Sequence, residues 1–414
     1  MDKSPRIHYG WVVIFTGLLV TIAAHGFGRM SYTLILPAMK EGLHFSYTQL
    51  GLLETGNFAA YLVMALVGGM LAARFGPRRV ISLALVLMCL SLAGMGIAHS
   101  FGFALAMRTL TGLGNGAAYV PAMALAAAWF APRLRGVATG IVTAGIGAGT
   151  MIAGIMVPPV IAAFGAEGWR YAWYLLGACV GVVAVISALA LRTTPAELGL
   201  KPIGEHSSAP PPAPGKSSAL QWAEVYRQGK VWYLGLVYFM YGFSYIIYVT
   251  FFVAYLVKQR GIPEAEAGGM WALAGGLSTV CGLVWGWISD KIGRARAAAL
   301  AYGVLGLAYG IYALSEARTG LYTSAVIFGL TAWSIPTITA ATAGDYVGPK
   351  LAPACLGFIT LFFGIGQALG PAVGGMLADR TGGFVVPLAL ATGVSVLGGL
   401  LALAMPRPAP TTKS

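Results

Sequence analysis

The chain has 414 residues, of which 58% are hydrophobic and only 9% are charged, and its mean hydropathy is +0.78. Soluble domains typically carry about 25% charged residues, so this composition excludes a water-soluble fold. The formal net charge of +13 would fit a nucleic-acid partner, but the placement of the basic residues, described below, argues against one.

Apolar runs of about 20 residues, the length that crosses the hydrocarbon core of a membrane, recur along the whole chain. The sequence contains twelve such runs. They cover residues 11–36, 48–72, 80–98, 103–127, 137–163, 171–191, 231–256, 267–289, 297–315, 321–344, 354–378 and 384–405. We therefore predict an all-α integral membrane protein with twelve transmembrane helices.

Three separated segments of the sequence occur twice at a nearly constant spacing. Gly26–Tyr32 corresponds to Gly242–Tyr248, and Gly69–Gly76 corresponds to Gly286–Gly293. At the spacing of the second pair, three glycines of the fifth run match glycines of the eleventh run: Gly140, Gly147 and Gly149 match Gly357, Gly364 and Gly366. The repeat predicts two pseudo-symmetric six-helix bundles. Secondary transporters use this arrangement to place a substrate site between their repeats.

The longest polar stretch lies between the sixth and seventh runs. It contains the run Pro210-Pro211-Pro212 among Gly, Ser and Ala, a composition typical of an extended linker. We predict an N-terminal bundle over residues 1–192, a cytoplasmic linker over 193–229, a C-terminal bundle over 230–406 and a cytoplasmic tail over 407–414. Because closely spaced glycines let helices approach in lipid, we expect the bundles to meet at the fifth and eleventh helices.

The basic residues are distributed unequally between the two predicted sides of the membrane. With both termini placed in the cytoplasm, 18 of the 26 Lys and Arg residues lie on that side, six lie outside and two lie within the runs. The positive-inside rule supports this orientation and explains the net charge without nucleic acid. We expect a multi-pass, monomeric protein of a bacterial inner (plasma) membrane. No metal or cofactor is expected, because the cysteines show no C-x-x-C spacing and the sequence has no G-x-x-x-x-G-K-[ST] motif.

The loop after the second run carries an informative pattern. Gly69–Arg79 resembles the G-x-x-x-D-R-x-G-R-R loop of the major facilitator superfamily, with Ala73 in place of the aspartate, and the second copy keeps Asp290 and Arg294. The resemblance covers the whole chain and implies a twelve-helix transporter. An aspartate at a helix end can pair with arginines of neighbouring helices and hold one of two conformations. We therefore expect Asp290, Arg294 and Arg74 to form a conformational latch; the alternative is a solvated basic loop that serves only topology.

Other motifs resemble the same superfamily. Arg108-x-x-x-Gly112-x-Gly114 is similar to its fourth-helix motif, and the segment Gly366–Gly375 is similar to its glycine–proline packing motif. Tyr9–Val13 and Trp129–Gly136 resemble segments of bacterial monocarboxylate and oxalate–formate porters. Many of these porters hold the carboxylate with an arginine of the eighth helix, whereas residues 267–289 contain no basic residue.

Only three ionised side chains fall well inside the predicted spans: Arg29, Glu54 and Arg108. An intramembrane charge is costly and therefore points to a functional site, and a net charge of +1 favours an anionic ligand. We predict that Glu54 and Arg108 take part in proton coupling, with Glu54 or His25 as the proton carrier. The alternatives are a structural ion pair between Arg29 and Glu54, and an Arg108 that only ties helices together.

Arg29 is the leading candidate for substrate binding, because its planar guanidinium matches a carboxylate with two parallel hydrogen bonds. His25, Arg29 and Tyr32 lie at i, i+4 and i+7, on one face of an α-helix. The resemblance implies that the first, fourth, seventh and tenth helices line the cavity. It adds these candidates: Asn115, Tyr119, Tyr241, Tyr245, Tyr248, Trp333 and Ser334. For His25 and the tyrosines, a packing role is the alternative.

These features predict a secondary active transporter that moves a small organic anion, expected to be a carboxylate, by alternating access with proton symport. Its partners would be the anion, the proton and the lipid bilayer. An exporter of amphipathic cationic or neutral compounds by proton antiport, with Glu54 recognising the charge, is the alternative within this class. A membrane sensor on a transporter fold is the alternative from another class. An enzyme is not expected, because no nucleophile–base pair is found.

Overall fold

The computed structural model describes residues 8–204 and 225–406, and most of these residues are helical. The first half contains α1 (Tyr9–Thr21), the π-helix η1 (Ile22–Met30), α2 (Tyr32–Leu43), α3 (Tyr47–Phe75), α4 (Pro77–Gly96), α5 (Phe101–Trp129), α6 (Arg135–Phe164) and α7 (Gly168–Ala190). The second half contains α9 (Gly229–Ala254), the π-helix η5 (Tyr255–Gln259), α10 (Glu264–Ile292), α11 (Arg294–Leu314), α12 (Arg318–Thr331), α13 (Ser334–Thr381) and α14 (Val385–Leu403).

Joined where they are continuous, these elements account for the twelve predicted runs: α1, η1 and α2 form the first run, α9 and η5 form the seventh, and α12 with the start of α13 forms the tenth. The first run is continuous over Tyr9–Leu43, and α13 is interrupted at Gly348, so that Arg318–Gly348 and Leu351–Thr381 are separate stretches. Apart from three short 3-10 helices, the described residues therefore form twelve long helical segments, and the predicted all-α membrane fold is confirmed. Ten stretches of the described chain are long and apolar enough to cross a membrane; one of them, Pro132–Ala190, contains both α6 and α7, and α5 is not among the ten.

The internal repeat is visible in the backbone. Gly76 and Gly293 precede α4 and α11, and their φ angles are +85° and +88°. The N–H of Gly76 donates to the carbonyl oxygen of Ala72 at 2.9 Å, and the N–H of Gly293 donates to that of Ser289 at 3.1 Å. A positive φ is a conformation that glycine adopts without a Cβ penalty. The glycine at both positions therefore follows from the same sharp turn between two helices.

The chain folds into two compact units. One contains residues 1–45, 56–209 and 256–279, and the other contains residues 46–55, 210–255 and 280–414. Each unit is thus mainly one half of the repeat with a short helical segment from the other half. The bundle boundaries at residues 192 and 230 stay a prediction. Most of the predicted linker, residues 205–224, lies outside the described residues, as does the tail from residue 407.

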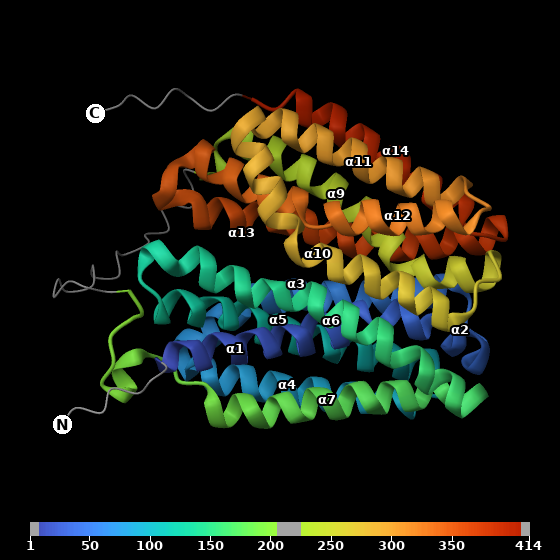
Figure 1. Cartoon of the computed structure of the whole chain (residues 1–414), viewed down its shortest axis with the longest axis horizontal. Coiled ribbons are helices and arrows are strands. Elements are labelled where there is room, and N and C mark those ends of the chain that lie inside the picture. Colours follow the sequence, from blue (N-terminus) through green and yellow to red (C-terminus); the bar gives the residue numbers. More distant parts are fainter. Residues whose placement is uncertain (1–7, 205–224, 407–414) are drawn as a thin grey trace. The chain divides into compact units, whose positions relative to one another are not determined.

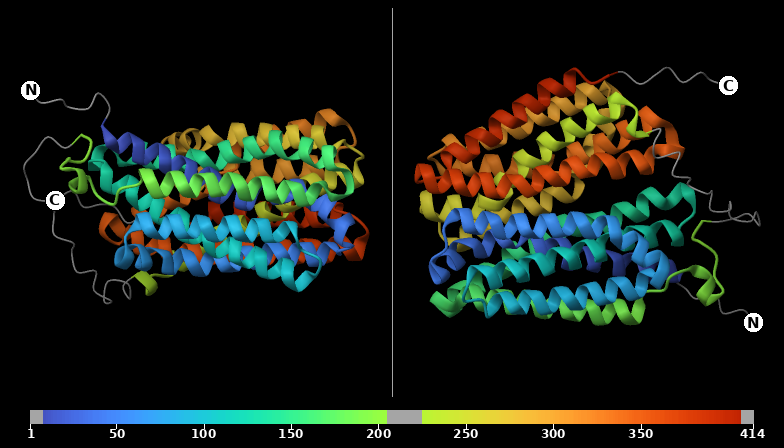
Figure 2. Two further views of the ribbon diagram at one scale, coloured as in Figure 1. Left: turned by 90° about the horizontal axis from the view of Figure 1, so that it is seen from below. Right: turned by 180° about the vertical axis from the view of Figure 1, so that it is seen from behind.

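Within the first unit, α4 packs between α5 and α7, and η1 packs against α6. Figures 1 and 2 show α4 and α7 running side by side. The approach of η1 to α6 is very close, since a Cβ added at Gly26 would lie 2.5 Å from the Cα of Gly149. Within the second unit, α9 packs against α13 and α11 against α14 (Figure 1). Glycines at the crossings allow this backbone contact in place of a hydrophobic driving force.

The described start of the predicted linker is attached to the first unit. Ile203 donates its N–H to the carbonyl oxygen of Trp129 and accepts from the N–H of Ala131, each at 2.9 Å. The indole of Trp129 donates to the carbonyl oxygen of Arg192 at 3.0 Å, and the hydroxyl of Tyr9 donates to that of Ala190 at 2.9 Å. The Tyr9–Val13 and Trp129–Gly136 motifs therefore fasten the chain where it leaves α7.

Helices from opposite halves of the repeat also contact one another, and two of these contacts bring glycine residues against a neighbouring backbone. In the first unit, a Cβ added at Gly147 of α6 would lie 2.6 Å from the carbonyl oxygen of Gly275 of α10, and one at Gly154 would lie 2.6 Å from that of Gly268. By contrast, a Cβ at Gly140, also in α6, would meet nothing within 4 Å. The glycines of α6 are therefore not equivalent. Gly147 and Gly154 allow the close approach of α10, whereas Gly140 takes no part in it.

The other contact lies in the second unit, between the start of α3 and the end of α13. The carboxylate of Asp379 accepts the N–H of Tyr47 at 2.9 Å and the N–H of Thr48 at 2.7 Å, so it caps α3 from another helix. A Cβ added at Gly375 would lie 2.1 Å from the carbonyl oxygen of Tyr47. By the predicted orientation, both contacts between the halves lie toward the outer side of the membrane.

Candidate functional site

The π-helix η1 interrupts the first transmembrane helix where the leading candidates lie. All nine residues of Ile22–Met30 are buried, and they include His25 and Arg29. The π-helices of proteins occur frequently at functional sites, because the wider turn redirects side chains. Irregular backbone at membrane depth is tolerated where it is buried in protein or lines a cavity. The buried π-helical backbone of Ile22–Met30 thus supports the prediction that this segment belongs to a functional site.

Arg29 and His25 lie in an aromatic cluster of the first unit. The guanidinium of Arg29 is 4.1 Å from the ring centre of Phe58 and 5.2 Å from that of Tyr61, both on α3. The imidazole of His25 is 4.3 Å from the ring of Tyr119 on α5 and 5.8 Å from that of Tyr61, measured between centroids. Cation–π contacts of this kind stabilise a positive charge away from water. A buried cation beside two hydroxyl-bearing rings is an arrangement that can bind an anion.

Tyr32 lies in a second cluster, formed around Arg108. The ring centre of Tyr32 is 4.5 Å from the guanidinium of Arg108, which is also 5.7 Å from the ring of Trp173. The prediction that His25, Arg29 and Tyr32 lie on one face of the helix assumes that the helix is α-helical throughout. The π-helix places more than 3.6 residues in each turn, so the chain leaves η1 with a changed register. Tyr32 consequently packs against Arg108 and Trp173.

The contacts of Arg108 are those of a residue that ties helices together. It is fully buried, and its Nη1 donates to the carbonyl oxygen of Gly28 in η1 at 2.9 Å. The amide of Asn57 on α3 donates to the backbone carbonyl oxygen of Arg108 at 3.0 Å. Asn115, one of the predicted binding residues, likewise donates to the carbonyl oxygen of Ala24 at 2.7 Å. These bonds satisfy the carbonyl oxygens that the π-helix and its neighbours expose.

We expect Arg108→Met to lower stability more than it alters substrate selectivity. The change removes a charge-assisted hydrogen bond, about 1.5–3 kcal/mol, together with a buried cation–π contact. The thermal midpoint of the purified variant should fall by several degrees, while the ranking of stabilising ligands stays that of the wild type. A variant with the wild-type midpoint and a changed ranking would show instead that Arg108 contacts the ligand.

Glu54 is 3% exposed and lies on α3, one helical turn before Phe58. The next residue, Thr55, donates its hydroxyl to the carbonyl oxygen of Ala368 on α13 at 2.6 Å. Glu54 therefore belongs to the part of α3 that packs in the second unit. A carboxyl group in this position is placed near a contact between helices of opposite halves.

The second unit holds a stack of aromatic rings on α9 and α13. The rings of Tyr241 and Tyr245 are 4.6 Å apart and nearly parallel, and Phe363 lies 5.7 and 6.0 Å from them. The hydroxyl of Tyr241 donates to the carbonyl oxygen of Ala332, and the amide of Gln367 donates to the hydroxyl of Tyr245. Both tyrosines are thus oriented by hydrogen bonds at positions one helical turn apart.

Trp333 and Ser334 lie at the break between α12 and α13, and Trp333 is next to the ring of Tyr245 in this stack. The rings of Trp333 and Tyr245 are 6.3 Å apart and meet edge to face. Trp333 Nε1 and Ser334 Oγ are buried and have no hydrogen-bond partner among the described residues. Buried polar atoms without partners are uncommon, and a ligand or water commonly satisfies them. Of the candidates in the second half, Trp333 therefore lies beside Tyr245, and Tyr241 is stacked on the same tyrosine and bonded next to Trp333.

Tyr248 lies elsewhere, in the packed interior of the second half. Its hydroxyl is 2.8 Å from the hydroxyl of Ser324, and its ring packs 4.7 to 5.0 Å from those of Tyr309, Tyr312 and Phe328. These partners come from α11 and α12. Tyr248 is therefore enclosed by side chains of α11 and α12, and its predicted part in substrate binding stays a prediction.

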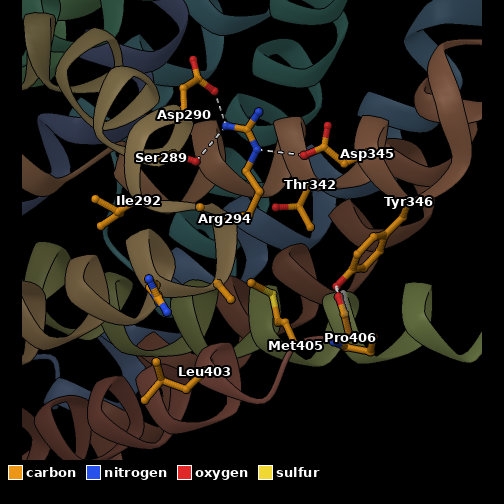
Figure 3. A pocket seen from close by; sticks show the side chains of 13 residues that line it. Ser289, Asp290, Ile292, Arg294, Thr342, Asp345, Tyr346, Leu403, Met405 and Pro406 are labelled. Atoms are coloured by element: carbon orange, nitrogen blue, oxygen red, sulfur yellow. Dashed lines mark hydrogen bonds and ion pairs between the residues drawn. The ribbon is translucent and has the colours of Figure 1, made fainter. Parts of the chain in front are cut away.

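Two of the three predicted latch residues, Asp290 and Arg294, form an ion pair at the predicted cytoplasmic end of the second unit. Arg294 donates from Nη1 to Asp290 at 2.5 Å and to the hydroxyl of Ser289 at 2.9 Å, and from Nε to Asp345 at 2.9 Å (Figure 3). It thus ties the end of α10 to the start of α11 and to α13. Arg74 of the first copy contacts the ring of its neighbour Phe75 at 5.2 Å. Arg294 therefore pairs with two carboxylates. In the first copy the position that corresponds to Asp290 is Ala73, so Arg74 has no aspartate beside it there.

Sequence reasoning missed several residues that surround the candidates: Phe58, Tyr61, Phe363 and Gln367. Glu54, Phe58 and Tyr61 lie at i, i+4 and i+7 of α3, so the helical spacing from the predicted charge would have found the last two. Phe363 and Gln367 are likewise four residues apart on α13. No group of three or more His, Cys, Asp or Glu residues within the described chain is arranged to hold a metal ion.

A model of the major facilitator superfamily matches residues 18–352, and the chain belongs to this family. It is 28% identical to the 3-(3-hydroxy-phenyl)propionate transporter of Escherichia coli, over 96% of this chain and 92% of that protein. It is 25% identical to human monocarboxylate transporter 11, over 98% of this chain and 85% of that protein. The protein is therefore a multi-pass membrane transporter and not an enzyme.

A solved structure shows the same fold. A bacterial homolog of the human lysosomal transporter Spinster, in an inward-facing and unoccupied conformation, aligns with a TM-score of 0.77 at 18% identity, covering 98% of this chain and 96% of that one. The twelve-helix architecture of two bundles agrees with this likeness.

Proposed function

We propose that the protein transports a small organic anion with a carboxylate group, and that Arg29 binds the carboxylate. The observation that carries the proposal is the buried guanidinium in η1, held against Phe58 and Tyr61. Rings that stack on the faces of a guanidinium leave its N–H groups in the plane, where a carboxylate accepts two parallel hydrogen bonds. In a low-dielectric interior such a pair is much stronger than in water.

The substrate classes named for the relatives support an anion. Phenylpropionates and monocarboxylates each carry a carboxylate group, and the proteins named for them align with nearly the whole chain. The aromatic residues around Arg29 and His25 would suit a compact organic acid. Tyr119 and Tyr61 add hydroxyl groups that can donate to the same oxygen atoms.

We further propose that uptake is coupled to protons through Glu54 or His25. His25 Nδ1 is buried without a hydrogen-bond partner among the described residues, so this imidazole can accept a proton or donate to a ligand. Glu54 is the one acidic side chain of the described first half that lies deep within a span. His25 lies one turn before Arg29 in η1, and Glu54 lies one turn before Phe58 in α3. The cellular site we propose is the bacterial inner membrane, with both termini cytoplasmic.

We expect reconstituted proteoliposomes to accumulate a labelled carboxylate when the outside is more acidic than the inside. Benzoate, lactate and 3-phenylpropionate are suitable probes, and the corresponding amides are matched uncharged controls. Uptake should rise severalfold with the inward proton gradient, fall when a protonophore collapses it, and be absent for the amides. If cationic or neutral compounds are transported and no carboxylate is, the result would contradict the proposal and favour the exporter.

A further inference from the structure

The two copies of the repeat each form a cavity at the predicted cytoplasmic end. The cavity of the first copy has a volume of about 480 Å³ and is lined by Arg78, Arg79, Ser82, Leu83 and Ala188. That of the second copy has a volume of about 680 Å³ and contains Arg296 and Met405, the repeat counterparts of Arg79 and Ala188. The same backbone turn precedes both (Gly76 and Gly293). The two cavities therefore occupy equivalent places in the repeat.

Their charges differ. The second cavity contains Asp290, Arg294 and Asp345, which Figure 3 labels, and it is also lined by Arg296, so its charges sum to zero. At the spacing that relates Gly76 to Gly293, the positions of the two aspartates in the first half are Ala73 and Ala128. The first cavity is lined by two arginines and, among the described residues, by no acidic side chain.

The two arginines of the first cavity have different surroundings. Arg78 donates from Nε at 2.9 Å and from Nη2 at 2.5 Å to the carbonyl oxygen of Ala188, so it caps the end of α7. Arg79 is exposed and makes no hydrogen bond or ion pair with another described residue. Glu197 accepts from the N–H of Thr193 and does not line the cavity.

The position of Arg79 at the start of α4 strengthens the argument. The N-terminus of a helix carries partial positive charge, so a basic side chain in the first turn of α4 is unfavourable unless a negative group lies nearby. The carbonyl oxygen of Ala188 offsets this for Arg78 but not for Arg79. The cavity thus combines two guanidinium groups with the N-terminal end of a helix. A phosphate group has the charge and the oxygen acceptors that such a site requires.

An apolar surface runs along both helices from this cavity. On α4, Leu83, Val86 and Leu90 are 46 to 70% exposed, and on α7, Val182, Val185 and Leu189 are 60 to 68% exposed. Within each helix these residues are three and four positions apart and share one face. Since α4 and α7 pack side by side (Figures 1 and 2), the two stripes would offer acyl chains a continuous surface in the membrane.

We propose that the cavity between the start of α4 and the end of α7 binds the phosphate head group of an anionic phospholipid. Basic pockets between helices on the cytoplasmic side are suited to such head groups. The apolar stripes favour a lipid over free phosphate as the source of the anion. The equivalent cavity of the second copy, whose arginines are neutralised by carboxylates, does not bind it. This proposal is independent of the transported substrate.

The test uses the full chain in detergent, with phosphatidylglycerol, phosphatidylcholine or inorganic phosphate added, and measures lipid retained by native mass spectrometry and the thermal midpoint. Arg79→Gln should reduce the apparent affinity for phosphatidylglycerol about fivefold, as expected for the loss of one basic contact near the head group, and Arg79→Lys should restore most of it. Arg296→Gln is the matched control, because it removes the equivalent exposed arginine from the neutral cavity, and it should bind as the wild type does.

Three results would overturn the proposal. One is an Arg79→Gln variant that retains phosphatidylglycerol like the wild type, and another is an equal loss in Arg296→Gln. The third is a midpoint rise of the same size with inorganic phosphate or with phosphatidylcholine, because the site would then recognise a free anion or any lipid. Arg78 is left unchanged throughout, since its bonds to the end of α7 make it part of the fold.

Discussion

Replacing Arg29 with alanine is expected to reduce carboxylate transport at least 100-fold, measured as kcat/KM for uptake into proteoliposomes. A bidentate pair contributes two charge-assisted hydrogen bonds of about 1.5–3 kcal/mol each, and about 1.4 kcal/mol corresponds to a factor of ten. Truncation also leaves the substrate carboxylate without a counter-charge in the protein interior. The aromatic partners Phe58 and Tyr61 remain in the variant.

Two further variants separate the loss of binding from the loss of the fold. Arg29→Lys keeps the charge but not the planar fork, so transport should be intermediate between wild type and Arg29→Ala. Tyr61→Phe keeps the ring near the cation and removes one hydroxyl, and should change uptake less than tenfold. If Arg29→Ala retains its thermal midpoint and still transports at more than a tenth of the wild-type rate, the anion site lies elsewhere.

Replacing Gly154 with valine should lower transport more than tenfold while leaving ligand binding detectable. A Cβ at this position would lie 2.6 Å from the carbonyl oxygen of Gly268, and backbone atoms of two packed helices cannot give way as a flexible side chain would. Overpacking of this kind costs about 1–3 kcal/mol. If alternating access requires α6 and α10 to close and to separate, this cost falls on the closed arrangement alone. It would then shift the population of the closed state by about five- to 150-fold.

Gly140→Val is the matched control, because it places the same side chain on the same helix at a position with nothing within 4 Å. It should transport at close to the wild-type rate. Gly275→Val, on the opposite side of the contact, should behave like Gly154→Val, since its Cβ would lie 2.7 Å from the backbone nitrogen of Met151. Equal rates for Gly140→Val and Gly154→Val would mean that the α6–α10 contact is not rate-limiting for the cycle.

The fold could be predicted from the sequence because its main determinants are local or repetitive. Runs of about 20 apolar residues define membrane helices, and the positions of Gly76 and Gly293 in the repeat anticipate the same turn in both halves. The glycine spacing in α6 indicates packing residues, but not which partner each one meets. Spacing alone does not distinguish Gly140, which is open, from Gly154, which touches α10.

The candidate site was predictable only in part. The cost of an intramembrane charge singles out Arg29 and Arg108, but not the π-helix that separates Tyr32 from the aromatic cluster of Arg29. No residue pattern in this sequence predicts the π-helix, because the π-helix depends on tertiary contacts such as the hydrogen bond from the amide of Asn115 to the carbonyl oxygen of Ala24. In the second half, a buried membrane helix is apolar on all sides, so Tyr245 and the interior Tyr248 look alike in sequence.

The most direct test of anion recognition is the thermal stability of the purified wild-type protein with matched pairs of ligands: benzoate and benzamide, lactate and lactamide, and 3-phenylpropionate and its amide. A ligand that binds only the folded state raises the midpoint. We predict that at least one carboxylate raises it, that its amide does not, and that the rise disappears in Arg29→Ala. Equal stabilisation by a carboxylate and its amide, or stabilisation only by cations, would contradict the proposal that this transporter carries an organic anion held by Arg29.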